Sequence, residues 1–189
     1  MRITYNAPVT LTFALVSTLV LLVDTLTGAR LAERFFAVGG SMDFTDPVDY
    51  VTLLSHVIGH ANWTHLVSNF AFILLLGPIL EEKYGSGGLL FMVAITALAT
   101  GLLNVILFST GLLGASGIVF MMILLGSFTN FRKGEIPLTF ILVVVLYLAR
   151  EIVTAFQADT VSQFAHIAGG FCGSLFGFLG PGAPPQASA

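Results

Sequence analysis

Long apolar stretches constrain this chain more than any other feature of its sequence. We count six of them, each close to the roughly 20 residues that a helix needs to cross a bilayer. Of the 189 residues, 56% are hydrophobic and only 9% are charged, which is too apolar for a soluble domain of this size. The sequence therefore predicts an all-α membrane protein with six spanning helices. They are expected at residues 9–26, 65–80, 88–108, 116–130, 136–153 and 164–179.

The connections between these stretches indicate one domain. All are a few residues long except 28–64, which mixes aromatic and acidic side chains as expected of a loop at the membrane interface. We expect residues 1–180 to form a single six-helix membrane domain and the Pro- and Ala-rich residues 181–189 to form a disordered tail.

Charge and cysteine content narrow the possible partners and the topology. A net charge of −3 without a basic patch gives no sign of nucleic-acid binding, and the single cysteine, Cys172, is interpreted as a packing residue. The positive-inside rule slightly favours a cytoplasmic amino terminus in a bacterial or archaeal cell membrane. In that orientation Arg2, Lys83, Arg132 and Lys133 lie inside, and Arg30 and Arg34 lie in the outer loop.

Polar residues mark the first turns of three alternate helices. In a serpentine bundle the second, fourth and sixth helices run in the same direction, so their amino-terminal ends share one face of the membrane. The second opens with His65 and Asn69, four residues apart on one helix face. The fourth opens with Ser116, and the sixth carries His166 in its first turn. Polar groups in a membrane usually face the bundle interior, so we expect these four side chains to lie together.

Such a set of side chains suits acyl transfer. A serine hydroxyl needs a base to take its proton, and histidine is the usual one, which pairs Ser116 with His166. Because no carboxylate lies close to these positions, a dyad fits better than a triad, with Asp159 as a distant candidate for orienting His166. The unpaired Ser116 N–H at a helix start, helped by Asn69 and His65, would donate to a developing oxyanion.

Glycines predict close contact between the fourth and sixth helices. Gly114 and Gly117 flank the serine, and Gly169, Gly173 and Gly177 form a stripe at four-residue spacing on the sixth helix. Small residues let helix backbones approach closely in membranes. Taken singly, these glycines could mark helix packing alone, and a single histidine could be a satisfied bundle residue. The joint pattern favours a site.

The motifs HANWTHLVSN, EEKYGSG, GASG and AHIAGG occur in this order and together resemble the rhomboid intramembrane serine proteases. The resemblance covers nearly the whole chain. It implies a six-helix core, Ser116 as nucleophile, His166 as base, and an oxyanion site formed by the Ser116 N–H with His65 and Asn69. It implies no metal or cofactor, and it implies that the substrates are transmembrane helices of other membrane proteins entering from the lipid.

Other positions match the family in a structural capacity. The resemblance implies that His60 supports the site without taking part in catalysis, and that Glu81 holds the turn at the end of the second helix. The tryptophan–arginine pair common in the family's first loop is missing. Phe120 stands where some members carry a tyrosine that stacks on the catalytic histidine; four residues after Ser116, its ring can lie on the same helix face.

Two other functions remain open at this point. A non-catalytic relative could bind transmembrane helices without cutting them. A small transporter could use His56, His60, His65 and His166 as a proton path. The transporter has little support, because the predicted spans carry no charged residue in mid-helix apart from Asp24, which lies near the outer end of the first helix and is interpreted as an interfacial group. Labelling by a serine-directed probe separates the protease from both alternatives.

Overall fold

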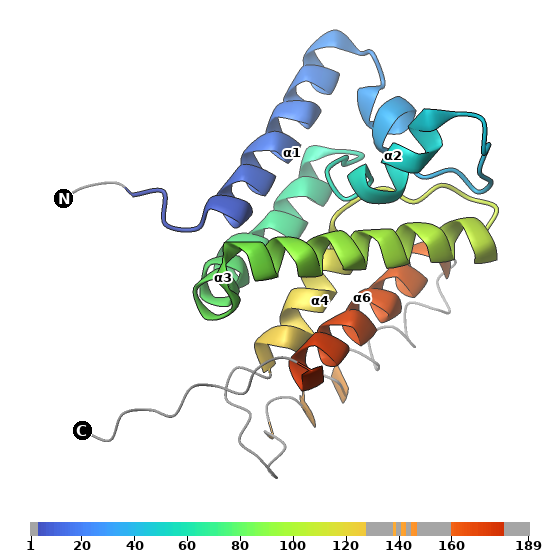
Figure 1. Ribbon diagram of the computed structural model, residues 1–189. Helices are drawn as coiled ribbons and strands as arrows, with labels where there is room; N and C mark the ends of the chain where they lie inside the picture. The colour runs from blue at the N-terminus through green and yellow to red at the C-terminus, as the bar shows by residue number, and fades with distance from the viewer. Residues whose placement is uncertain (1–3, 128–137, 139–140, 143–144, 147–159, 180–189) are drawn as a thin grey trace, which may run out of the picture.

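The computed structural model describes residues 4–127, 138, 141–142, 145–146 and 160–179. The predicted fifth helix lies largely outside these residues, as do Asp159 and the tail at 181–189. The described part is helical, as predicted, and Figure 1 labels its α-helices. These are α1 (Pro8–Thr27), α2 (Pro47–Ser55), α3 (Trp63–Leu107), α4 (Ser116–Ser127) and α6 (Thr160–Leu179), and a π-helical turn η1 (Ala32–Phe36) precedes α2.

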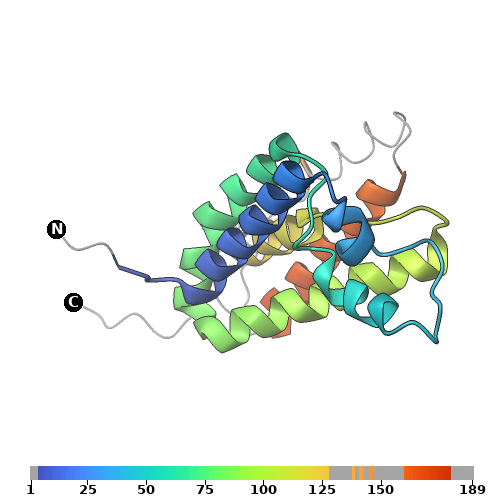
Figure 2. The ribbon, with the colours of Figure 1, turned by 90° about the horizontal axis from the view of Figure 1, so that it is seen from above.

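Helix α3 joins two stretches that we expected to be separate helices. Its 45 residues run on either side of Gly85, whose φ of 74° and ψ of 157° are not helical. Only glycine adopts such a backbone without strain, so the chain turns there, and Figures 1 and 2 show the two halves of α3 pointing in different directions. The second and third predicted spans are thus the two arms of α3: the first arm precedes Gly85 (residues 63–84) and the second arm follows it (residues 86–107).

Glu81 ties the turn in α3 to the start of α1. Ala7 precedes α1 and has no side chain that could cap it; the carboxylate of Glu81 takes this place instead. It accepts hydrogen bonds from the Val9 N–H at 2.9 Å and from the Thr10 N–H and hydroxyl at 3.0 and 2.8 Å. The Ser86 hydroxyl donates to the same carboxylate at 2.8 Å. A negative charge at a helix start is favourable, so Glu81 has the structural position that was expected.

Asp24, near the other end of α1, also accepts backbone N–H groups at a helix start. Its carboxylate accepts the backbone N–H of Leu31 at 2.6 Å and that of Ala32 at 3.3 Å. These contacts cap the start of η1, where helical N–H groups lack backbone partners. Asp24 is therefore a structural residue of the first loop, in line with the interfacial interpretation.

Helix α4 is the most enclosed of the described helices. It packs between α3 and α6, and Met121, Met122 and Leu125 on it are almost fully buried. A helix that is apolar all round belongs in the interior. Cys172 of α6 lies in the same core, as expected of a packing residue.

Among the described helices two, α1 and α3, are long and apolar enough to cross a membrane. Helix α4 and residues Phe164–Leu179 of α6 are apolar but shorter. Large apolar side chains lie exposed along α1 and both arms of α3, among them Leu19, Leu75 and Phe91. A surface of exposed apolar side chains is the kind that contacts the lipid chains of a bilayer. The described helices therefore fit a membrane protein, while the number of six spans is not established by them.

Candidate active site

Helices α4 and α6 touch through their backbones next to the predicted nucleophile. A Cβ built on Gly169 would overlap the carbonyl oxygen of Gly117, and one on Gly173 would overlap that of Met121. Both contacts advance by four residues along each helix, so α4 and α6 run parallel. The close approach expected from the glycine stripe is thus confirmed at Gly169 and Gly173.

The first arm of α3 runs in the same direction as α4. His65 lies against Gly114 just before α4 begins, and Leu76 lies near Gly126 toward the other end. With α6 also parallel to α4, the three helices share one orientation, as the sequence predicted. Their polar amino-terminal ends therefore lie at one end of the bundle.

His166 of α6 lies beside the first turns of α4. Its ring stacks at an angle of 39° on the ring of Phe120, with 4.4 Å between the centroids. The carbonyl oxygen of its neighbour Ala165 would be 3.3 Å from a Cβ on Gly117. We expected His166 in the first turn of its helix. It lies in the second, because α6 begins at Thr160, before the start at residue 164 that the apolar pattern suggested.

Ser116 opens α4 and is partly accessible, as is His166. The turn before it needs glycine, since Gly114 has a φ of 121°. A side chain there would also collide with the ring of His65, whose Cε1 and Nε2 atoms would lie 2.5 and 2.6 Å from the new Cβ. The His65 ring therefore lies directly over the backbone that leads into Ser116.

The first loop fixes the segment that precedes Ser116. Val38 and Leu112 exchange two backbone hydrogen bonds of 3.0 Å, a small antiparallel bridge between distant parts of the chain. The backbone carbonyl of His56 accepts the Gly114 N–H at 3.0 Å. These main-chain partners were not predicted, because main-chain bonding leaves no signal in residue identity.

Asn69 lies one turn after His65 on α3 and is buried. Its amide nitrogen is 3.1 Å from Nε2 of His60, and Nδ1 of His60 is 3.1 Å from the Ile58 carbonyl oxygen. The His60 ring also meets the His65 ring edge-on at 5.0 Å between centroids. His60, His65 and Asn69 therefore form one contiguous group.

His56 is a second buried histidine of the first loop. Its Nδ1 lies 3.2 Å from the Thr52 carbonyl oxygen and its Nε2 lies 3.2 Å from the Thr100 hydroxyl. The methyl group of Thr100 would be 3.2 Å from a Cβ on Gly117. The hydrogen-bonded pair of His56 and Thr100 therefore lies next to the first turn of α4. Burial lowers the pKa of both loop histidines, His56 and His60, to about 4, and both are therefore neutral at pH 7.

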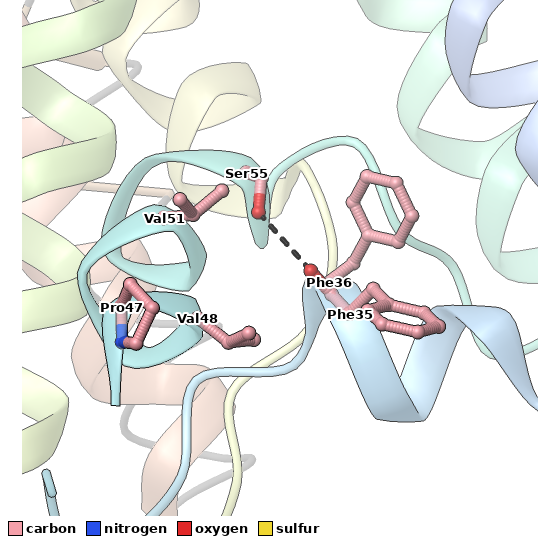
Figure 3. Close-up of a pocket in the computed structure, with 6 residues that line it drawn as sticks. All are labelled: Phe35, Phe36, Pro47, Val48, Val51 and Ser55. Carbon is pink, nitrogen blue, oxygen red and sulfur yellow. Dashed lines mark hydrogen bonds between the residues drawn. The ribbon is translucent and has the colours of Figure 1, made fainter. Parts of the chain in front are cut away.

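An apolar pocket of about 320 Å³ lies between η1 and α2. Figure 3 shows that its lining comes from the first loop alone, with Ser55 donating a hydrogen bond to the Phe35 carbonyl oxygen at 3.4 Å. None of the predicted site residues lines it. The six lining residues are Phe35, Phe36, Pro47, Val48, Val51 and Ser55.

Comparisons with known proteins point to one family. A family model described as the Rhomboid domain matches residues 47–182. The chain is 24% identical over 171 residues to Rhomboid-like protein 11, chloroplastic, of Arabidopsis thaliana, an alignment that covers 80% of this chain and 61% of that protein. It is 22% identical over 129 residues to Rhomboid protease GlpG of Haemophilus influenzae, covering 67% of each chain.

The matched region holds every residue predicted for the site and all the described helices except α1 and η1. One relative is chloroplastic and the other bacterial, so the comparisons do not support the expected bacterial or archaeal membrane over an organellar one. Because the family model covers more than half of the chain, the chain belongs to the rhomboid family.

Proposed function

We propose that this chain is an intramembrane serine endopeptidase that cuts transmembrane helices of other membrane proteins. Ser116 is the nucleophile and His166 is the general base. The observation that carries this proposal is the stacking of Phe120 on His166, combined with the backbone contact between Gly117 and Gly169. These contacts bring the imidazole of α6 to the turn of α4 that begins with Ser116. The relationship to a rhomboid protease of Haemophilus influenzae adds independent support.

The reaction follows from these roles. His166 takes the proton from the Ser116 hydroxyl as the oxygen attacks the scissile carbonyl carbon. The resulting imidazolium then gives this proton to the leaving amine, which departs and leaves an acyl-serine. Water, deprotonated by the same imidazole, attacks the ester and releases the new carboxylate. The Phe120 ring has no hydroxyl, so it orients His166 by packing alone.

The negative charge that develops on the carbonyl oxygen needs donors. The Ser116 N–H lies at the start of α4, where helical N–H groups lack intrahelical partners and the dipole favours an anion. Asn69 and His65 lie on the neighbouring first turns of α3 and supply side-chain N–H groups. Removing one such donor typically costs on the order of 10²–10³ in turnover.

The position of these groups at one end of the bundle sets where a substrate is cut. A carbonyl inside a helix is already hydrogen-bonded and is shielded by side chains, so the substrate must unwind locally first. Unwinding costs least where the substrate carries Gly or Pro and where water reaches the chain. The cut therefore falls near the end of the substrate helix that meets the amino-terminal ends of α4 and α6.

The membrane topology belongs to the same proposal. The two arms of α3 together with α1, α4, α6 and the stretch at 136–153 make six spans. With the amino terminus in the cytoplasm, the site opens toward the outer face. Protease protection of tags placed before residue 4 and within residues 28–64 tests this orientation, because only the second tag would be digested from outside.

The deciding experiment compares the wild type with Ser116→Ala and His166→Ala in proteoliposomes that carry a single-pass model substrate. Both variants should lose cleavage while keeping the wild-type thermal midpoint, and Ser116→Ala should also lose labelling by a fluorophosphonate. Ser127→Ala is the matched control, since this serine at the far end of α4 donates to the Ile123 carbonyl oxygen and should be dispensable. Continued proteolysis by purified Ser116→Ala protein would overturn the proposal, and a wild type that binds substrate without cutting it would identify a non-catalytic binder.

A further inference from the structure

His60 is fully buried in the loop before α3 and takes no direct part in the proposed chemistry. Its ring nonetheless touches both side chains of the proposed oxyanion site. Nε2 lies 3.1 Å from the amide nitrogen of Asn69, and the ring packs edge-on against His65. Nδ1 lies 3.1 Å from the Ile58 carbonyl oxygen.

The Ile58 carbonyl decides which proton form His60 adopts. A carbonyl oxygen only accepts, so Nδ1 must carry the hydrogen and donate it. In the neutral ring Nε2 then has a lone pair and must accept, which requires the –NH2 end of the Asn69 amide to face it. The flipped amide would put its oxygen against that lone pair. The two distances therefore assign the tautomer of His60 and the orientation of Asn69 together.

The orientation of this amide matters for the proposed reaction. The –NH2 group of Asn69 has two N–H bonds, and His60 uses one of them. The nitrogen stays on the side of the histidines, and its second N–H is the one that an oxyanion can receive. With the amide turned over, the Asn69 side chain would present its oxygen at that place and repel the developing charge.

We propose that His60 is a positioning residue of the oxyanion site, fixing the Asn69 amide as a donor through the chain of hydrogen bonds from Asn69 to His60 to the Ile58 carbonyl. This inference rests on the proposed function. It adds that the backbone of the first loop controls the strength of the oxyanion site through one imidazole. Burial lowers the pKa of His60 to about 4, which keeps the accepting, neutral ring in place at neutral pH.

The test compares two substitutions of His60. His60→Gln keeps an acceptor for Asn69 and a donor for Ile58, whereas His60→Phe fills the space and offers neither. With the model substrate, His60→Phe should lower kcat about 100-fold, the typical effect of losing one oxyanion donor, and change KM by less than about threefold. His60→Gln should recover most of kcat. If His60→Phe does not fold, His60→Met gives the same comparison, since a flexible thioether adapts to irregular space.

A double-mutant cycle separates positioning from general support. In an Asn69→Ala background His60→Phe should cost no further kcat, because His60 acts through that amide. Phe70→Leu is the matched control: Phe70 packs on the His60 ring at 5.6 Å but makes no hydrogen bond to it, so this variant should lower the thermal midpoint and spare kcat. The inference would be overturned if the two fold-losses of kcat multiplied in the double mutant. It would also be overturned if His60→Gln and His60→Phe lowered kcat equally. Should Ser116→Ala still cleave, the proposed function itself fails; a required Ser116 with normal kcat in His60→Phe refutes only this inference.

Discussion

Gly169→Ala tests how far the proposed chemistry depends on the contact between α4 and α6. A Cβ on Gly169 would lie 2.7 Å from the carbonyl carbon of Gly117 and 2.9 Å from its Cα. Both are backbone atoms of a buried helix and cannot move aside as a flexible side chain would. Helix α6 would therefore have to retreat by about 1 Å before the added methyl group reached ordinary van der Waals contact.

His166 is three residues before Gly169, so this retreat carries the imidazole away from Ser116. A displacement of about 1 Å at a reacting group can cost on the order of 100-fold in rate. We expect kcat to fall by about this factor and overpacking to cost about 1–3 kcal/mol of stability. Gly169→Leu, with a larger side chain at the same place, should be inactive.

The assay is initial-rate cleavage of the model substrate, with the thermal midpoint measured on the same preparation. Gly87→Ala is the control, because a Cβ at Gly87 would have no atom within 4 Å and alanine favours a helix. Unchanged kcat in Gly169→Ala would show that the distance between α4 and α6 does not govern the reaction, which contradicts the dyad.

Three further outcomes concern the cap of α1, the buried histidines of the first loop and the substrate. Glu81→Ala should lower stability by about 2 kcal/mol through the lost cap of α1, whereas the exposed neighbour Glu82→Ala should not, as read from thermal midpoints. Acid should destabilise the fold: His56 and His60 stay neutral to about pH 4 in the native state but bind protons below about pH 6.5 when unfolded. Stability therefore falls as the pH drops through this window, by about 3 kcal/mol for each histidine, and a pH-independent midpoint would contradict it. Replacing Gly and Pro near the cut in the substrate by Leu should slow cleavage strongly, and mass spectrometry of the products should place the cut near one end of the helix.

The sequence predicted what depends on helix order and residue size. Three parallel helices with polar amino-terminal ends follow from a serpentine path, and the contact at Gly169 follows from the glycine stripe. Helix boundaries were less predictable. His166 lies a turn deeper in α6 than expected, because residues 160–163, of which three are polar, continue the helix before its apolar stretch begins.

The supporting contacts of the site could not be predicted, because they use the main chain or link residues that are distant in sequence. The bridge between Val38 and Leu112 has no side-chain requirement that would mark it. The resemblance assigned His60 a structural part, but its bond to Asn69 needs the path of the loop to be known. Such contacts depend on tertiary geometry, which a local pattern does not encode.

The two glycines near Ser116 are needed for different physical reasons. Together they explain how a glycine-rich segment can hold the proposed nucleophile in a well-packed part of the structure. Gly114 needs its φ of 121° and leaves room for the His65 ring, and Gly117 lets the α6 backbone come close. The same segment is held by the His56 carbonyl and by the bridge to Val38. The glycines thus let the His65 ring and the α6 backbone come close to the Ser116 segment from two sides. The hydrogen bonds from the first loop restrict the backbone flexibility that glycines would otherwise give this segment. A proposed nucleophile whose backbone is held in this way keeps its N–H in a fixed direction, which is what preorganised stabilisation of an oxyanion requires.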